Sequence, residues 1–553
     1  MMPMRDGVRL HTVFYFPDNM PDKAPVVLVR SPYCRRTYFE LPHAEALKRN
    51  CVFIMQSVRG TAFSEGLFQP FLEDIEKNDA EDLLTYLEQQ PWFNGNCVMF
   101  GGSFPGYLQW SAARSGNSCL KAIAPKVAPL YGCCTAARPG GGIALGFIGS
   151  WLLSMHYRCK WGYENLPDLN GKRLWNTLPI NEYDRKIYDC TIDNFQEFLA
   201  SARCPEKALT RHKAWFKNIH TPAFISGGWF DYFKQESIES FKLMKQDAAT
   251  ASARQITRLT MGPWGHGGLL NPELFGAENN YDTLRKRETK FLFGMIDDPE
   301  TDPLPEDPVV TYFMLGENCW YGSGQWPPQG GVDTPFYLHS NGNANSCRGD
   351  GSLDNIPPQN EVADCFVSDP RQPVTTSGSL HGSFGCSNRA LVCQRQDVLV
   401  YDSAIFETDF TIAGRVKLQF FASISTVDTD FCASLSDVAP DGRCLAFTSG
   451  MLRARFAETM AEENFVSPGT VKRYEIDLGD TAIKFKAGHR MRLDICGQNF
   501  PVYDRNANSG KSGFGDTELF ESRITIFHDA EHPAVLILPV NDSCVPLAEV
   551  TAE

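Results

Sequence analysis

The fold of this chain is decided by the stretch Cys97-Val98-Met99-Phe100-Gly101-Gly102-Ser103-Phe104-Pro105-Gly106-Tyr107. An apolar run ends there in a turn of small residues, which holds one serine and leads into a segment compatible with a helix. A strand that turns sharply into a helix needs neighbours without bulk, and Gly101 and Gly106 supply that space. Pro105 replaces the usual second glycine of such a turn and is tolerated in a first helical turn. The stretch predicts a nucleophile elbow at Ser103, although many surface turns also contain Gly-x-Ser.

The chain is acidic and long enough to bury several cores. Its 553 residues include 52 Lys and Arg against 66 Asp and Glu, a formal net charge of −14. We expect two or three domains, because a single core stops growing beyond roughly 300 residues. The sequence has no basic cluster for a nucleic acid or an anionic membrane, and no apolar run as long as a membrane span. The first residues do not have the pattern of a signal peptide, so we expect a cytoplasmic protein.

The 18 cysteines are scattered from Cys34 to Cys544. Many lie inside apolar, strand-like runs, which indicates free buried thiols in a reducing compartment rather than a disulfide framework. No Cys-x-x-Cys pair is present, and Asp428-Thr429-Asp430 lacks the third carboxylate of a calcium loop. We therefore predict neither a metal site nor a cofactor. Glu73, Asp74 and Glu76 are interpreted as the solvated start of a helix.

The first 130 residues alternate short apolar runs with helical patterns. This alternation is typical of an α/β fold with a mostly parallel sheet wrapped by helices. A helix is expected over 78–87, where capping residues precede apolar residues at helical spacing. The predicted strands are 8–16, 26–30, 51–57, 97–100 and 121–125.

The remaining sequence divides into three parts. Residues 130–220 lose the alternation and predict a helical insertion that covers the sheet edge as a lid. Strand patterns return at 222–228 and 258–262, separated by a helix over 234–245 and followed by one over 289–295. After a linker at 297–308, short alternating strands such as 309–315, 415–425 and 490–495 indicate an antiparallel sandwich or jelly roll. We therefore predict an α/β-hydrolase catalytic domain (1–129 and 221–300), a lid (130–220) and a C-terminal jelly roll (309–553).

Two later segments supply the partners that a serine nucleophile needs. A serine hydroxyl requires a base, and the base requires a carboxylate that orients it. Asp231 follows one predicted strand and His266 follows the next. The order Ser103, Asp231, His266 is the order in which α/β-hydrolases arrange their triad. The three residues are therefore the predicted catalytic triad, with a packed histidine and a turn aspartate as the alternative interpretation.

Several motifs together resemble the cocaine-esterase-like acyl hydrolases, relatives of the X-Pro dipeptidyl peptidases and α-amino acid ester hydrolases. The resemblance runs almost from end to end of the chain. It departs from the family pattern at Gln56-Ser57 and at Phe104. At the position of Phe104 the family usually has tyrosine. C-terminal segments similar to the family's jelly-roll signatures are Asp428-Thr429-Asp430, 438–443 and 499–510. The catalytic motifs are Val29-Arg30-Ser31-Pro32-Tyr33, Gln56-Ser57-Val58-Arg59-Gly60 with Ser64-Glu65-Gly66, Gly101-Gly102-Ser103-Phe104-Pro105-Gly106, Gly228-Trp229-Phe230-Asp231 and Gly262-Pro263-Trp264-Gly265-His266.

The resemblance implies an oxyanion site made by the Tyr33 hydroxyl and the backbone N–H of Phe104. The mechanism it implies agrees with the residues: Ser103 attacks an acyl carbonyl, and His266 takes its proton and later protonates the leaving group. The Phe104 backbone donor survives the change from tyrosine, but the side-chain hydroxyl is lost. Candidates for contact with substrate are Phe104, Trp151 and Trp229, although aromatic clusters are more often core.

The leading functional hypothesis is a serine-dependent ester or amide hydrolase for a small or medium acyl substrate. Two enzyme alternatives stay open: an acyltransferase or cyclase that uses the same triad in secondary metabolism, and an X-Pro or α-amino acyl peptidase. A non-catalytic binding module is a third alternative. The expected partner is a small acyl compound, without nucleic acid or membrane, and the sequence leaves open whether the chain forms a homodimer.

Overall fold

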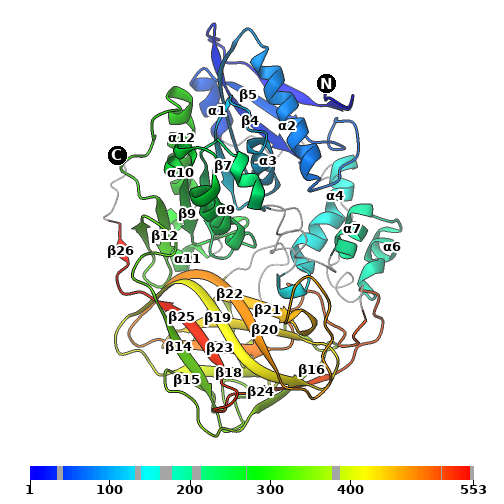
Figure 1. Cartoon of the computed structure of the whole chain (residues 1–553), viewed down its shortest axis with the longest axis vertical. Coiled ribbons are helices and arrows are strands. Elements are labelled where there is room, and N and C mark those ends of the chain that lie inside the picture. The colour runs from blue at the N-terminus through cyan, green and yellow to red at the C-terminus, as the bar shows by residue number, and fades with distance from the viewer. Residues whose placement is uncertain are drawn as a thin grey trace.

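The computed structural model describes residues 1–33, 41–130, 139–161, 177–201, 213–269, 271–279, 281–375, 386–511 and 514–547. Two large sheets organise them, one in the upper and one in the lower half of the view, and a group of helices lies to the right between them (Figure 1). Among the helices in these ranges, none combines the length and the apolar character that crossing a lipid bilayer requires.

The upper sheet has ten strands in the described chain, in the order β26-β13-β12-β9-β8-β7-β6-β4-β5-β3. Its central pairings are parallel, and antiparallel pairings close both edges. The strands are β3 (Thr12–Tyr15), β4 (Ala24–Ser31), β5 (Val52–Ser57), β6 (Phe93–Gly102), β7 (Leu120–Lys126), β8 (Phe224–Gly228), β9 (Arg258–Gly262), β12 (Val310–Met314), β13 (Cys319–Ser323) and β26 (Val545–Pro546). The five strands predicted in the first 130 residues correspond to strands of the structure, the first as β2 (Arg9–Leu10) and β3.

One predicted strand belongs to a different sheet from the one expected. The sequence predicts the segment 309–315 in the C-terminal sandwich, but β12 pairs in parallel with β9, with Val310 opposite Leu259. All five residues of β12 are buried. A strand covered on both faces does not alternate hydrophobic and polar residues, and without that alternation the sequence does not show which sheet the strand joins. The strands β12 and β13 therefore complete the upper sheet, although they lie beyond the predicted boundary at residue 309.

Helices cover both faces of the upper sheet. Neighbouring residues of β4 belong to separate cores: Leu28 shares one with Leu83 of α2, and Val27 shares the other with Phe291 of α12. Burial on both faces explains why these strands are nearly continuous hydrophobic runs. The helices are α1 (Leu41–Lys48), α2 (Glu73–Glu88), α3 (Phe104–Ala113), α9 (Lys234–Asp247), α10 (Ala251–Ile256), α11 (Pro272–Phe275) and α12 (Tyr281–Asp297).

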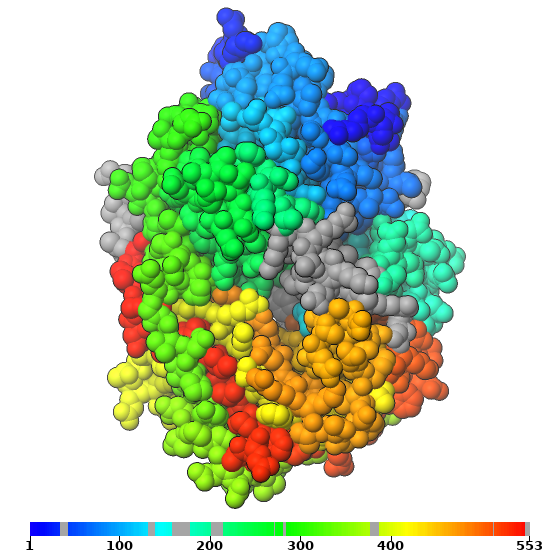
Figure 2. Space-filling model, viewed as in Figure 1, coloured from blue at the N-terminus to red at the C-terminus, as the bar shows by residue number. Residues whose placement is uncertain are grey.

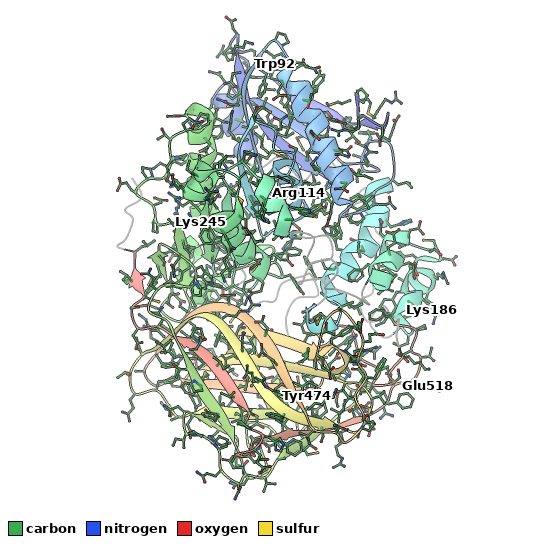
Figure 3. The ribbon with its side chains drawn as sticks, viewed as in Figure 1. Trp92, Arg114, Lys186, Lys245, Tyr474 and Glu518 are labelled. Atoms are coloured by element: carbon green, nitrogen blue, oxygen red, sulfur yellow. The ribbon has the colours of Figure 1, made fainter. Side chains whose placement is uncertain are left out.

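The lower sheet is mainly antiparallel and has twelve strands in the described chain. Tyr474, labelled in Figure 3, lies inside it against the rings of Phe420 and Phe431, with centroid distances of 5.7 and 4.6 Å. Side chains that alternate along these strands form this core. The main strands are β14 (Val332–His339), β15 (Ser352–Asp354), β16 (Asp364–Ser368), β17 (Ser387–Asn388), β18 (Val398–Ser403), β19 (Phe410–Ile424), β20 (Asp430–Val438), β21 (Cys444–Arg453), β22 (Lys472–Phe485), β23 (Arg490–Cys496), β24 (Ser522–Phe527) and β25 (Val535–Val540).

The helical segment between β7 and β8 is joined closely to the lower sheet. A Cβ added at Gly140 would lie 1.9 Å from the carbonyl oxygen of Met451, so the chain approaches β21 where a side chain has no room. The Ile143 N–H donates to the Asp504 carboxylate at 2.8 Å. The space-filling view shows the upper and lower halves in direct contact (Figure 2). The segment contains η2 (Pro139–Gly141), η3 (Leu145–Gly149), α4 (Ser150–Trp161), η5 (Ile180–Glu182), α6 (Tyr183–Tyr188), α7 (Asp193–Ser201) and η6 (Lys213–Asn218).

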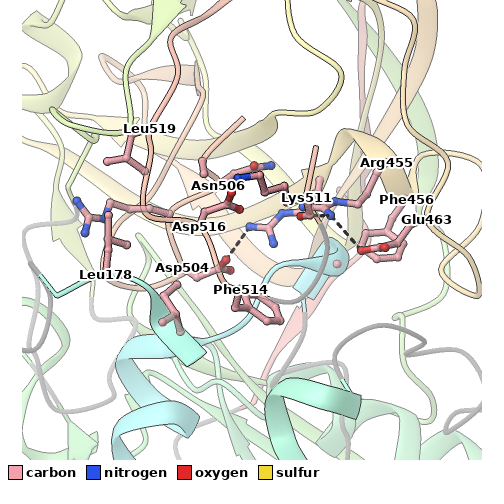
Figure 4. A pocket seen from close by; sticks show the side chains of 15 residues that line it. Leu178, Arg455, Phe456, Glu463, Asp504, Asn506, Lys511, Phe514, Asp516 and Leu519 are labelled. Carbon is pink, nitrogen blue, oxygen red and sulfur yellow. Dashed lines mark hydrogen bonds and ion pairs between the residues drawn. The ribbon is translucent and has the colours of Figure 1, made fainter. Parts of the chain in front are cut away.

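Asp428 and Asp430 form a buried ion network at the same junction. Asp430 accepts from the Arg453 guanidinium at 2.8 Å, and Asp428 accepts from Arg455 at 2.9 Å. Arg453 also contacts Asp504 at 3.0 Å. Figure 4 shows the pocket beside this network, whose volume of about 30 Å³ has room for about one water molecule. Both aspartates are thus occupied by guanidinium partners, and Asp504, which shares Arg453, links this network to Ile143 of the helical segment.

Candidate active site

The elbow predicted from the sequence is present between β6 and α3. Ser103 follows the last residue of β6 and precedes the first residue of α3, with φ 62° and ψ −132°. A positive φ is rare for a residue with a side chain, and such strain concentrates at functional sites. A Cβ added at Gly106 would lie 2.5 Å from the Cβ of Ala128, and one at Gly101 would lie 2.8 Å from the Cβ of Pro105. Both glycines therefore allow the close backbone approach in the turn from β6 to α3, which leaves the Ser103 side chain accessible.

Ser103, His266 and Asp231 form a hydrogen-bonded chain. The Oγ of Ser103 lies 2.9 Å from Nε2 of His266, and Nδ1 of His266 lies 2.7 Å from Oδ2 of Asp231. Adjacent parallel strands end at the same sheet edge, which brings the loops after β6, β8 and β9 together. Because a carboxylate can only accept, Nδ1 carries the proton and Nε2 is left to accept from the serine hydroxyl. This is the arrangement that a general base needs.

The side chains of Asp231 and His266 are held from several sides. The Asp231 side chain is fully buried, and its Oδ1 accepts the N–H of Phe233 at 2.8 Å. The imidazole of His266 is packed by Phe147 and Phe233, whose ring centroids lie 4.9 and 5.5 Å away with their planes steeply inclined to it. Phe147 itself stacks on Tyr232 at 4.2 Å. The histidine side chain keeps 18% of its surface exposed, so solvent can reach it.

An aromatic cluster adjoins the serine on the side of the helical segment. Phe104 stacks on Trp151 of α4, with ring centroids 5.6 Å apart. Tyr33 packs against the same cluster. The structure thus places two predicted substrate-contact residues and the predicted oxyanion tyrosine together, next to Ser103. The N–H of Phe104 belongs to the first turn of α3, where backbone donors have no partner within the helix.

Sequence reasoning missed two members of this cluster, Phe68 and Phe71. Phe71 lies 5.1 Å from Phe104 and 6.0 Å from Trp151 between ring centroids, and Phe68 lies 5.9 Å from Phe104. Phe71 has φ 67°, an unusual value for a bulky residue. The local signal was an aromatic pair beside Pro70 in a loop, which does not reveal its distant partners. Asn194 of α7 donates to the Phe68 carbonyl at 2.8 Å, which links this loop to the helical segment.

The structure corrects the assignment of Trp229 to the substrate site. The Trp229 side chain is buried, and its indole N–H donates to the carbonyl of Phe313 on β12 at 2.7 Å. Its ring packs on Trp326 at a centroid distance of 5.3 Å. Trp229 precedes Asp231 by two residues but points into the contact between β12 and the lower region. It is a core residue, because the tight turn after β8 directs the two side chains differently.

The structure also corrects the interpretation of Glu76. The Glu76 side chain is buried on the inner face of α2, and its Oε2 lies 3.4 Å from the guanidinium of Arg30. Burial raises the pKa of the Glu76 carboxyl to about 7, and the neighbouring Arg30 charge opposes that rise. Only the outward positions of this first turn, such as Asp74, are exposed. The acidic run therefore contains one buried carboxyl, at the helical position that faces the sheet.

Comparison with known proteins identifies the family. Residues 6–268 match the family model described as X-Pro dipeptidyl-peptidase (S15 family), and residues 305–537 match the model of the X-Pro dipeptidyl-peptidase C-terminal non-catalytic domain. The chain is 32% identical to cocaine esterase from Rhodococcus sp. (strain MB1 Bresler), over 98% of this chain and 97% of that protein.

Solved structures share the whole architecture. An α-amino acid ester hydrolase superposes with a TM-score of 0.81 at 21% identity, over 98% of this chain and 96% of its own. An aminopeptidase from a marine sediment Thaumarchaeota archaeon has a TM-score of 0.81 at 22% identity, over 98% of this chain and 95% of its own. At these identities the likeness establishes the fold, an N-terminal catalytic part followed by a strand-rich C-terminal part. The chain belongs to the cocaine-esterase-like, X-Pro dipeptidyl-peptidase (S15) family and is a serine hydrolase of ester or amide bonds.

Proposed function

We propose that the chain hydrolyses carboxylic esters of small or medium acyl groups, with Ser103, His266 and Asp231 as its catalytic triad. The observation that carries the proposal is the continuous hydrogen-bonded chain from the Ser103 hydroxyl through His266 to the buried Asp231. His266 removes the serine proton as Ser103 attacks the acyl carbonyl, and then protonates the leaving alcohol. Water, activated by the same imidazole, releases the acid from the acyl-enzyme.

The oxyanion of the tetrahedral intermediate is assigned to two donors, the N–H of Phe104 and the hydroxyl of Tyr33. The first rests on the position of Phe104 at the start of α3, directly after the nucleophile. The second rests on the family motif and on the packing of Tyr33 against Phe104. Such donors stabilise charge that develops only in the transition state, which is where they accelerate the reaction.

The acyl group is proposed to pack against Phe104 and Trp151, with Phe68 and Phe71 as further walls. Aromatic side chains beside the nucleophile offer an apolar surface for an aliphatic or aromatic acid. The helical segment, residues 130–220 in our division, contributes Trp151 to this wall and Phe147 to the packing of His266. We assign it the role of a lid that excludes water from the acyl-enzyme.

The relatives favour an ester over a peptide as the substrate. The relative at 32% identity is named an esterase. From it we propose the type of bond that this chain hydrolyses, an ester, and not the particular ester. We also propose a jelly roll for the C-terminal strands and a cytoplasmic location. The location is supported by the free thiols of the cysteines in the described part of the chain, such as Cys97 and Cys432.

The experiment measures release of p-nitrophenol from acetate and butyrate esters by the purified chain. Ser103→Ala and His266→Ala are each expected to lower kcat by a factor on the order of 10⁴ or more. Ser118→Ala, an exposed serine, is the matched control and should retain full activity. A fluorophosphonate probe should label the wild type and fail to label Ser103→Ala. Full activity in either triad variant would refute the assignment.

A second measurement separates hydrolysis from the alternatives. In isotope-labelled water, hydrolysis places the label in the acid product. An unlabelled acyl product on an added alcohol or amine would instead indicate an acyltransferase. Faster cleavage of dipeptidyl p-nitroanilides than of the simple esters would favour the peptidase alternative.

A further inference from the structure

A cavity of about 290 Å³ lies behind the catalytic loops, where the upper sheet meets the lower one. Phe230, the residue before Asp231, forms part of its wall, and so does α11, which follows the His266 loop. Figure 1 shows α11 and β12 just above the strands of the lower region. The opposite wall comes from β21, β22 and the turns at their ends. The cavity is separate from the aromatic cluster at Ser103, because the two share no lining residue.

Apolar side chains from both halves of the molecule form part of the walls of this cavity. Phe230 packs on Phe275 with ring centroids 5.6 Å apart, and both side chains are almost fully buried. The remaining apolar side chains are Leu274, Leu315, Leu445, Phe447 and Ile483. An apolar cavity of about 150 Å³ already binds a benzene molecule, so this one has room for a substituted ring.

The charged groups around the cavity are arranged in pairs. His489 donates Nδ1–H to Asp437, at 2.8 and 2.9 Å from its two oxygens. Arg443 is held by Asp441 through Nε at 2.6 Å. Glu273 lies on the exposed side of α11, where water solvates its carboxylate. The Asp437 carboxylate and the Arg443 guanidinium therefore each already have a partner, so a charged ligand gains little from either group.

His489 is a lining residue that can form a hydrogen bond with a ligand. The Asp437 contact uses Nδ1 of His489, so Nε2 is the ring nitrogen that remains. The two halves are hydrogen-bonded to each other beside the cavity, since the Leu315 N–H donates to the Ala482 carbonyl at 3.0 Å. A preformed apolar space with a few polar groups is the usual form of a small-molecule site.

We propose that this cavity is a second binding site, for a small uncharged aromatic or aliphatic molecule with a single hydrogen-bonding group. Its apolar body lies among Phe230, Phe275 and Phe447, and its polar group meets His489. The binding does not depend on the proposed catalytic function. The site adjoins the loop of the catalytic acid without being part of the catalytic machinery.

The test uses 4-fluorobenzyl alcohol as the probe and follows its binding by fluorine NMR. Saturable binding at low millimolar concentration is expected in the wild type. Leu445→Trp, which fills the cavity from β21, should weaken binding at least tenfold. Leu391→Trp is the matched control, because Leu391 is 78% exposed and lies outside the cavity, and it should bind like the wild type. If Leu445→Trp does not fold, Ile483→Phe fills the same space.

Three results would overturn the proposal. One is the absence of saturable binding to the wild type, and another is equal binding by the wild type and a folded cavity-filled variant, which would place the probe at Ser103 or elsewhere. The third is tighter binding of 4-fluorobenzoate or 4-fluorobenzylammonium than of the alcohol, which would contradict an uncharged ligand. Because the readout is binding rather than turnover, an inactive enzyme would leave the test intact.

Discussion

Replacing Asp231 by asparagine tests the hydrogen-bond logic of the triad without changing its shape. Both oxygens of Asp231 accept an N–H in the structure, one from Phe233 at 2.8 Å and one from His266 at 2.7 Å. An asparagine has one acceptor oxygen and one NH₂ group at these two positions. If its oxygen stays on Phe233, the NH₂ faces Nδ1 of His266 and drives the proton to Nε2. Nε2 then donates toward Ser103 and cannot take its proton.

The opposite orientation is also unfavourable. With the asparagine oxygen on His266, the NH₂ faces the buried N–H of Phe233, and two donors without an acceptor cost about 1–3 kcal/mol. In this orientation the imidazolium formed during the reaction also loses its carboxylate. We therefore expect Asp231→Asn to lower kcat about 10⁴-fold, which corresponds to about 5.5 kcal/mol of transition-state stabilisation.

The assay is hydrolysis of p-nitrophenyl butyrate at saturating substrate, with thermal unfolding measured in parallel. Asp22→Asn is the matched control, since Asp22 is exposed, and it should keep wild-type kcat. A decrease of less than tenfold in Asp231→Asn, in a protein that melts like the wild type, would refute the reasoning. It would mean that the carboxylate does not set the tautomer of His266.

Two further predictions concern stability. Glu76 has a folded-state pKa of about 7, above its ordinary value of 4.5. Its protonated carboxyl therefore adds to the free energy of unfolding below pH 4.5, and this contribution is lost as pH rises toward 7. As pH rises from 4.5 to 7, the free energy of unfolding of Glu76→Gln should therefore increase relative to that of the wild type, by on the order of 3 kcal/mol. Denaturant unfolding at several pH values measures this change. An equal difference in unfolding free energy at every pH would contradict the buried carboxyl. Gly106→Ala should destabilise the fold by about 1–3 kcal/mol, because its new Cβ would meet Ala128 at 2.5 Å, and an unchanged melting temperature would show that the elbow can relax.

Local patterns in the sequence were sufficient for most of the parallel strands of the upper sheet. A strand, a turn of small residues and a helix specify the elbow within eleven residues, and each feature depends on side chains close in sequence. The predicted strands match β4 to β7, and the helix predicted over 78–87 lies inside α2. The order Ser103, Asp231, His266 could also be predicted, since each residue follows a strand and parallel strands end at one sheet edge.

Contacts between distant segments could not be predicted from the same patterns. Trp229 looks like a candidate for substrate contact, but only the position of β12 shows that its indole lies in the core. The segment 309–315 resembles any buried strand, and its sheet is decided by pairing with β9. Phe71 gives no local sign of the rings that surround it. A hydrophobic side chain in the sequence predicts burial, but it does not predict which residues the side chain will pack against.

The sequence by itself therefore determined the elements that carry the candidate triad, the order of its three residues and the family motifs. These depend on turn chemistry and on hydrophobic periodicity, which act over a few residues. Only the tertiary structure decided which aromatic rings adjoin the nucleophile, which strands complete each sheet and which acidic side chain is buried. These depend on packing between residues far apart in the chain, and burial of Glu76 beside Arg30 shows the physical reason: the same carboxyl is ordinary in water and strongly perturbed inside the fold.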